Sequence, residues 1–207
     1  MDASPLPFRL PLVAILRGIT PGEALPHASA LVEEGYDAIE IPTNSPDWKT
    51  SVADCARELG AHATIGAGTV LTQAHVDALV DAGGKLMVTP NTRPPLIRYA
   101  VDRGLHVAAG FATASEAFDA LDAGAQTLKL FPASVQGPAL VRALRSVLPP
   151  VPLFAVGGVT PENLPAYLSA GCHGAGIGGE LYQPGQAVER TRERARRFRQ
   201  AYLDHFA

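Results

Sequence analysis

The sequence predicts an α/β fold, a closed (β/α)8 TIM barrel, from two signals that repeat along the chain. The first is a glycine, or once the pair Pro149-Pro150, at the end of each helix-like stretch. The second is a short apolar run a few residues later. Together they recur about every 20 to 25 residues, the length of one strand–helix unit in a compact barrel. Glycine fits the left-handed position that follows a helix. These glycines are Gly35, Gly60, Gly83, Gly104, Gly124 and Gly171.

The apolar runs are mostly too short for helices and are followed by turn residues, so they predict buried strands. An eightfold alternation is compatible with a barrel or a doubly wound sheet, and the number of units and their even spacing favour the barrel. No linker interrupts the chain, so we expect one domain over 1–207. The predicted strands are Leu12–Leu16, Ala38–Ile41, Ala63–Ile65, Leu86–Val88, His106–Ala109, Thr127–Phe131, Leu153–Val156 and Gly174–Ile177.

Helix starts are predicted between these strands. Thr20, Ser45 and Thr160 each stand before a proline, a pairing typical of a helix N-terminus. Thr113 is followed three residues later by Glu116, as in a capping box. The sequence therefore predicts helices that begin at these four positions.

Composition and charge limit the kinds of partner, location and metal site that we expect for this chain. A formal net charge of −3 argues against nucleic acid, and the basic segment 189–199 is predicted to be a solvated helix face. No apolar stretch is long enough to cross a membrane. The first residues lack a basic segment and carry Pro11, so we expect no signal peptide and a cytoplasmic location. Cys55 and Cys172 have no metal-type spacing and are expected to be buried thiols, with no metal site.

Lys129 is the first candidate for chemistry. It is one of only three lysines and lies in the middle of the apolar run 127–131. Strand side chains alternate, so if Leu128 and Leu130 face the helices, Lys129 points into the barrel. Burial lowers the pKa of an amine and makes it available as a nucleophile. A structural ion pair is the alternative.

Glu40 is the second candidate. It is the only acidic residue inside a predicted strand, and the same alternation directs it into the barrel. A carboxylate near a buried amine can act as a general acid and base, or can form a structural ion pair. Two such residues on different strands of one barrel favour catalysis.

Residues at the carboxyl ends of the strands complete the candidate site, because that end of a barrel carries the active site. Arg17 ends the first strand and is expected to bind an anion; an outward, surface-paired arginine is the alternative. Glycine clusters after the last two strands favour phosphate binding by backbone amides over plain turns. Thr69 and Pro90 follow the third and fourth strands, and Phe131 is expected to close the pocket beside Lys129.

These motifs resemble the 2-keto-3-deoxy-6-phosphogluconate and 6-phosphogalactonate aldolases, which are class I pyruvate-type enzymes. The resemblance runs from Pro11 to about Tyr202 and rests on AILRGITP, AIEIPTNSP, IGAGTVL, VTPN, LKLFPAS, AVGGVTPEN and GAGIGGELY. It implies that Lys129 forms the Schiff base, that Glu40 moves protons, and that Arg17 and Thr69 touch the substrate. It also implies a phosphate site at Gly157, Gly158, Gly178 and Gly179, and a homotrimer.

Within this family the chain is more similar to the galactonate type. The gluconate type usually has an arginine where this chain has Asn44, and often a threonine where it has Val156. Gly179 stands where members commonly have serine, so only a backbone contact to phosphate is available there.

The resulting hypothesis is cleavage of a phosphorylated 2-keto-3-deoxy sugar acid, the galactonate epimer, with no cofactor or metal. Action on the gluconate epimer, or on both, is the first alternative. A sugar-phosphate isomerase or epimerase and a non-catalytic phosphate-binding barrel are the others. The isomerase or epimerase would not need an amine inside the sixth strand, and the high cost of burying Lys129 and Glu40 speaks against the non-catalytic barrel.

Overall fold

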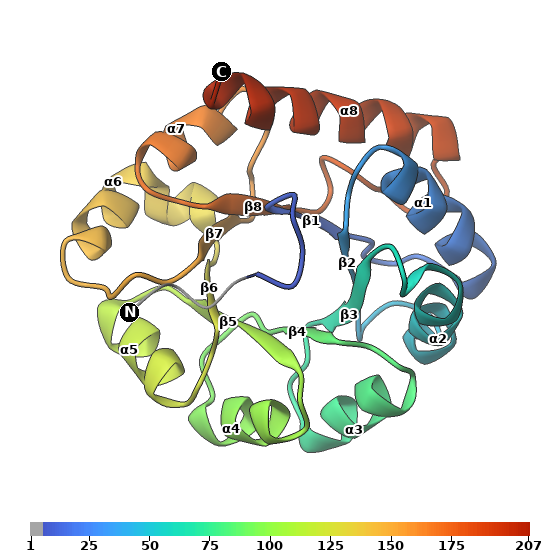
Figure 1. Ribbon diagram of the computed structural model, residues 1–207, viewed down its shortest axis with the longest axis horizontal. Coiled ribbons are helices and arrows are strands. Elements are labelled where there is room, and N and C mark those ends of the chain that lie inside the picture. The colour runs from blue at the N-terminus through green and yellow to red at the C-terminus, as the bar shows by residue number, and fades with distance from the viewer. Residues whose placement is uncertain (1–5) are drawn as a thin grey trace.

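The computed structural model describes residues 6–207 and contains the predicted closed barrel (Figure 1). Residues 1–5, part of the predicted domain, lie outside the described residues. Eight parallel strands pair in chain order, and β1 closes the ring by pairing Val13 with Gly176 of β8. Helices surround the ring in Figure 1. The strands are β1 (Leu12–Ile15), β2 (Ala38–Pro42), β3 (Thr64–Gly68), β4 (Leu86–Val88), β5 (His106–Phe111), β6 (Thr127–Leu130), β7 (Leu153–Val156) and β8 (Gly174–Ile177).

All eight strands lie where the sequence predicts them, with ends that differ by a few residues. β3 is the largest difference, because it runs on to Gly68, paired with Pro42 of β2. Glycines carry no apolar side chain, so the hydrophobic pattern could not reveal this extension. The helices are α1 (Pro21–Glu33), α2 (Trp48–Leu59), α3 (Gln73–Asp81), α4 (Pro94–Asp102), α5 (Ala114–Asp122), α6 (Ala133–Arg145), α7 (Leu164–Ser169) and α8 (Val188–His205).

The glycines after the helices mostly have the predicted left-handed backbone. Gly35, Gly83, Gly104, Gly124 and Gly171 have φ between 76° and 110°. Gly60 does not: its φ is −62°, in the right-handed region, so the prediction is wrong there. Beyond α2 the chain continues in further turns, with the N–H groups of His62 and Ala63 donating to Leu59, so no left-handed residue is needed.

Two of the four predicted helix starts are confirmed. Thr20 precedes α1, and Thr113 caps α5 by accepting the N–H of Glu116. The other two predictions are wrong. Ser45 instead accepts the N–H of Gly18 at 2.9 Å, and α2 begins at Trp48. The Thr160 N–H donates to Asn163 Oδ1 at 2.8 Å in a turn that delays α7 until Leu164.

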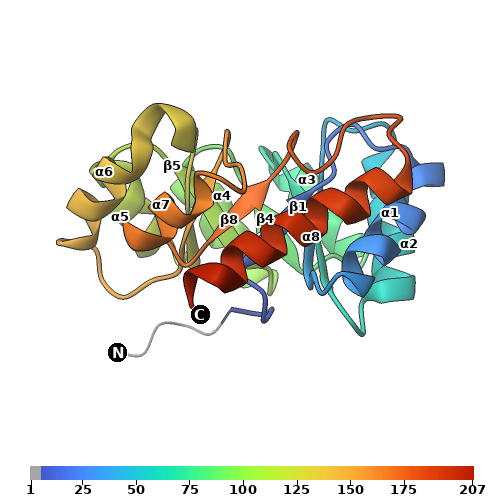
Figure 2. The same ribbon diagram turned by 90° about the horizontal axis from the view of Figure 1, so that it is seen from above.

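One end of the barrel is closed by the segment before β1, which crosses beneath the strands (Figure 2). Phe8 is buried there, edge-on to the ring of Phe154 with their centroids 6.0 Å apart. Asp37 holds the segment by accepting the N–H groups of Arg9 and Leu10 at 2.7 and 3.0 Å. This segment therefore covers the end of the barrel opposite the carboxyl ends of the strands.

The basic segment in α8 was predicted to be a solvated helix face, but several of its arginines form ion pairs. Arg192 and Arg196 form ion pairs with Glu34, which follows the last residue of α1, and Arg197 pairs with Glu162. Within residues 6–207 no helix is both long enough and apolar enough to cross a bilayer. Cys55 and Cys172 are buried thiols, as predicted, and burial raises the pKa of each to about 12.

Candidate active site

Lys129 points into the barrel from the middle of β6, as the alternation of strand side chains predicts. Its neighbours Leu128 and Leu130 are fully buried on the opposite, helix-facing side. The lysine side chain is 6% exposed, and its Nζ lies 4.9 Å from the centre of the Phe131 ring. The eight ion pairs found in residues 6–207 do not include Lys129, so the amine has no carboxylate partner among the described residues.

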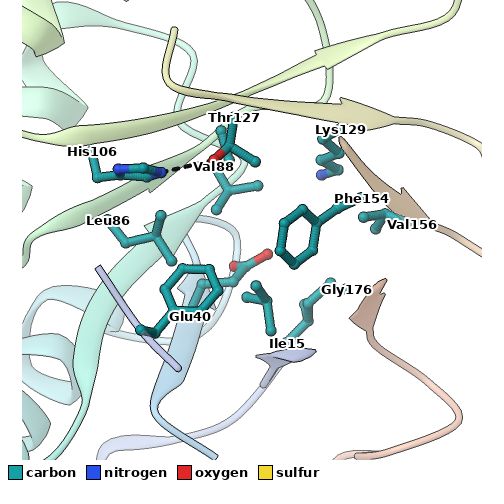
Figure 3. A pocket seen from close by; sticks show the side chains of 13 residues that line it. Ile15, Glu40, Leu86, Val88, His106, Thr127, Lys129, Phe154, Val156 and Gly176 are labelled. Carbon is teal, nitrogen blue, oxygen red and sulfur yellow. Dashed lines mark hydrogen bonds between the residues drawn. The ribbon is translucent and has the colours of Figure 1, made fainter. Parts of the chain in front are cut away.

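Glu40 points into the same space from β2, on the opposite side of the ring of strands (Figure 3). Its side chain is 1% exposed. The Oε2 atom is buried and has no hydrogen-bond partner within the described part of the chain. Together with Lys129 it lines an interior cavity of about 20 Å³, which is room for roughly one water molecule.

Burial sets the titration of both groups. It raises the pKa of Glu40 to about 7, although the positive charges of Lys129 and Arg17 oppose the change. It lowers the pKa of Lys129 to about 8; the carboxylate of Glu40 opposes this shift and Arg17 adds to it. A free amine and a basic carboxylate near neutral pH are the combination that covalent catalysis requires.

His106 and Thr127 form a polar pair deeper in the barrel, and sequence reasoning did not single them out as site residues. The ring Nε2 of His106 lies 2.8 Å from Thr127 Oγ1 (Figure 3). Burial lowers the pKa of His106 to about 4, so the imidazole is neutral at physiological pH. Thr127 is two residues before Lys129 and lines the same cavity. The pair therefore adds no charge beneath the lysine.

Arg17 lies exposed at the mouth of the barrel rather than on its outer surface. Its Nη1 donates to Asn44 Oδ1 at 2.7 Å, and both terminal nitrogens lie 3.4 Å from Thr69 Oγ1. Thr69 has a positive φ of 56°, a conformation that costs energy for a residue with a Cβ. The Thr43 hydroxyl donates to the Thr69 carbonyl at 2.6 Å and holds it there. Arg17 and Thr69 are thus brought together at the ends of the strands, and substrate contact by both stays a prediction.

A second cavity, of about 290 Å³, opens at the mouth above the interior one. Lys129 and Val156 line both cavities, so the amine stands at their junction. Phe131 lines the mouth, as predicted. Pro90 lines neither cavity, because the backbone of Pro90 and Asn91 packs against Gly110 of β5. The mouth is lined by Ile15, Arg17, Lys129, Phe131, Val156, Gly157, Gly158, Val159, Gly176, Gly178, Gly179 and Glu180.

Backbone amides gather on one side of the mouth. Two runs of three consecutive residues lie there, 157–159 after β7 and 178–180 after β8. Their backbone N–H groups have no acceptor among residues 6–207. Gly157 and Gly158 have φ of 95° and 75°, which favours glycine. Unpaired amides around a concave surface form an anion-binding site. Val159 and Glu180 were missed because a backbone donor leaves no signal in side-chain identity.

The comparisons with known proteins agree with this geometry. The family described as KDPG and KHG aldolase matches residues 8–194. The chain belongs to the KDPG and KHG aldolase family. This confirms the resemblance found in the sequence, and the barrel is the fold of the family's solved structures.

Two similar relatives carry the same description. The chain is 55% identical to the 2-dehydro-3-deoxy-6-phosphogalactonate aldolase of Escherichia coli (strain K12), over 95% of this chain and 96% of that protein. It is 47% identical to the probable 2-dehydro-3-deoxy-6-phosphogalactonate aldolase of Rhizobium meliloti (strain 1021), over 94% and 93%. A solved native KDPGal structure is 52% identical, superposes with a TM-score of 0.95, and is matched over 100% of this chain and 99% of that one.

Proposed function

We propose that this KDPG and KHG aldolase family member is a class I aldolase. It cleaves 2-dehydro-3-deoxy-6-phospho-D-galactonate to pyruvate and D-glyceraldehyde 3-phosphate. The observation that carries the proposal is the buried, unpaired amine of Lys129 at the junction of the two cavities. The pKa of this amine, lowered to about 8 by burial, leaves a useful fraction uncharged near neutral pH.

In the proposed reaction, Lys129 Nζ attacks the C2 ketone to give a carbinolamine, which loses water to form an iminium ion. A base removes the C4 hydroxyl proton, the C3–C4 bond breaks, and its electron pair moves into the iminium to give an enamine. The aldehyde leaves, C3 of the enamine takes a proton, and water hydrolyses the new iminium to release pyruvate. The iminium is the electron sink, so the route needs no metal ion.

Glu40 is the proton carrier in this scheme. Its carboxylate is buried in the cavity that Lys129 also lines, and its Oε2 atom has no other partner in the described residues. A carboxyl group whose pKa is about 7 can both accept and return a proton near neutral pH. The free volume between the cavity walls would admit one water to relay the proton.

The two acidic ends of the substrate then have different partners. The phosphate lies against the unpaired amides at Gly157, Gly158, Gly178 and Gly179. Arg17, on the β1 side of the mouth with Thr69 beside it, pairs with the carboxylate.

The galactonate epimer is proposed because of Val156 and Asn44. Val156 lines both cavities and offers no hydroxyl to the C4 region. Asn44 accepts a hydrogen bond from Arg17 at 2.7 Å, where a second arginine would instead repel it. A missing or added hydrogen bond to a substrate hydroxyl can decide between epimers.

Reductive trapping tests the chemistry. Borohydride added with pyruvate should leave a stable adduct on Lys129, located by mass spectrometry of peptides. Lys129→Ala should form none, and Lys49→Ala, on the exposed start of α2, should form it normally. An adduct on the Lys129→Ala protein would sink the assignment. Absence of any adduct on the wild type would favour the isomerase or the non-catalytic alternative.

Comparison of kcat/KM for the two epimers tests the substrate. A higher value for the galactonate compound supports the proposal, and a higher value for the gluconate compound overturns it. We also propose, from the family resemblance, that the assembly is a homotrimer. Light scattering should then give three times the chain mass of 21.7 kDa.

A further inference from the structure

Arg194 of α8 contacts the loop that follows β8. Its Nη1 donates to the Gly179 carbonyl at 3.2 Å and to Gln186 Oε1 at 3.2 Å. Arg192, Arg196 and Arg197 of the same helix all pair with carboxylates. Arg194 has no such partner among residues 6–207, so its side chain is committed to the loop.

We propose that Arg194 is a positioning residue for the phosphate site: it turns the Gly179–Glu180 peptide so that the Glu180 N–H faces the mouth of the barrel. The inference rests on the proposed function, in which that loop holds the phosphate. Arg194 itself does not touch the substrate.

The direction of the amide follows from peptide geometry. In the described chain the one cis peptide joins Phe131 to Pro132, so the Gly179–Glu180 peptide is trans. The C=O and N–H of a planar trans peptide point in opposite directions. Arg194 holds the Gly179 carbonyl toward α8 at 3.2 Å, with Gln183 Nε2 as a longer second donor at 3.4 Å, so the Glu180 N–H points away from α8. Gly179 and Glu180 line the mouth cavity, and this N–H has no acceptor in the described residues.

Gln186 supplies a second hold on the loop. Its Oε1 accepts the Gln183 N–H at 3.1 Å as well as Arg194, and its Nε2 donates to the Leu181 carbonyl at 2.9 Å. The same Nε2 donates to Thr191 Oγ1 at 2.6 Å, in α8. The loop is therefore closed on itself and tied to α8 at two points, Arg194 and Thr191.

The direction of the Gly179–Glu180 peptide matters because residue 179 is a glycine. A glycine there offers no hydroxyl, so the loop reaches an anion only through its amides. A Cβ at position 179 would meet nothing within 4 Å, so the glycine is not required by crowding. When the backbone alone supplies the donors, whatever fixes the direction of the peptide fixes the strength of the site.

Two substrates test the inference, the phosphorylated sugar acid and its unphosphorylated counterpart. Arg194→Met keeps the length of the side chain and removes its donors. We expect it to raise KM for the phosphorylated compound about tenfold, the effect of one weakened hydrogen bond to a charged group, with kcat little changed. Arg194→Lys, which keeps a charged donor group, should restore part of the loss. Inhibition by inorganic phosphate should weaken in parallel.

Two readouts separate positioning from general damage. The unphosphorylated substrate and pyruvate trapping on Lys129 do not use the phosphate site, so both should be unchanged in Arg194→Met. Arg197→Met, one turn further along α8 and paired with Glu162 rather than with the loop, is the matched control and should behave as wild type.

Equal losses on both substrates, or no loss on either, overturn the role of Arg194. If wild-type enzyme does not prefer the phosphorylated compound, the proposed function itself fails, and the inference fails with it.

Discussion

The Glu40 carboxylate occupies the space that a side chain at Gly68 would fill. A Cβ placed on Gly68 would lie 1.9 Å from Glu40 Oε2 and 2.4 Å from Oε1. Gly68 ends β3, in register with Pro42 two residues beyond the glutamate. The absence of a side chain on one strand therefore sets the position of the carboxylate on its neighbour.

Gly68→Ala should displace the Glu40 carboxylate and lower kcat, because a proton carrier must lie within hydrogen-bond reach of its target. A loss of about 10² to 10⁴ is the usual range for removing general acid–base catalysis. Gly22→Ala is the control: Gly22 lies in α1 with nothing within 4 Å of a new Cβ, so kcat should not change. Full activity in Gly68→Ala would show that the carboxylate position is not critical.

Lys129→Met should abolish cleavage and stabilise the fold. The amine is 6% exposed and has no ion-pair partner in the described residues, whereas a thioether of similar length is suited to the apolar wall. Removing an unpaired buried polar group raises the free energy of unfolding by about 1–3 kcal/mol. In a chain of this size each kcal/mol moves Tm by about 2–4 °C. Thermal unfolding checks this, and a lower Tm in the variant would contradict the stated cost of burying the amine.

The charge of Glu40 should be measurable through the titration of Lys129. In the wild type, the rate at which an acylating reagent modifies Lys129 should rise with pH through a pKa of about 8. The negative charge of Glu40 stabilises the ammonium form, so Glu40→Gln should lower this pKa. Mass spectrometry of the modified peptide gives the rates. An unchanged or higher pKa in Glu40→Gln would contradict the coupling.

The charge of Arg17 acts on the same amine in the opposite direction. Its positive charge disfavours the ammonium form, so Arg17→Met should raise the pKa of Lys129 above its wild-type value. The same acylation rates measure it. The two variants should therefore shift the curve to opposite sides, which no general loosening of the site would produce.

Val156→Thr should move the epimer preference toward the gluconate compound. The new hydroxyl would enter the space that Val156 lines beside Lys129 and could bond the C4 hydroxyl of that epimer. One such hydrogen bond is worth about 1 kcal/mol, or roughly fivefold in the ratio of kcat/KM values. Kinetics on both compounds decide it, with Val159→Thr, further along the same rim, as the control.

The recurrence of helix-ending glycines and short apolar runs predicted the barrel, and the alternation of strand side chains predicted which way its two central residues face. Lys129 and Glu40 are polar residues in apolar strands, and a period of two leaves no choice about which side they face. Arg17 and the glycine clusters were predicted from their places at strand ends.

Features that depend on the backbone or on distant partners were not predictable. The amides of Val159 and Glu180 are donors whatever the side chain, and their direction is set by the turn. Arg194 belongs to a segment expected to be solvated, and only the tertiary structure shows that it contacts the loop after β8. Gly60 and Ser45 were misassigned because further turns and a contact to Gly18 replaced the local signals.

Phe8 covers the end of the barrel opposite the mouth. With that ring packed against Phe154 beneath the strands, the route that the structure offers to substrate and products is the mouth. In the proposed reaction, pyruvate is covalently bound to Lys129 between the two cavities, while the phosphorylated aldehyde lies at the mouth. The aldehyde must therefore pass through the mouth before pyruvate can, because pyruvate stays bonded to Lys129 farther in. The order of product release then follows from the position of Lys129 below the mouth.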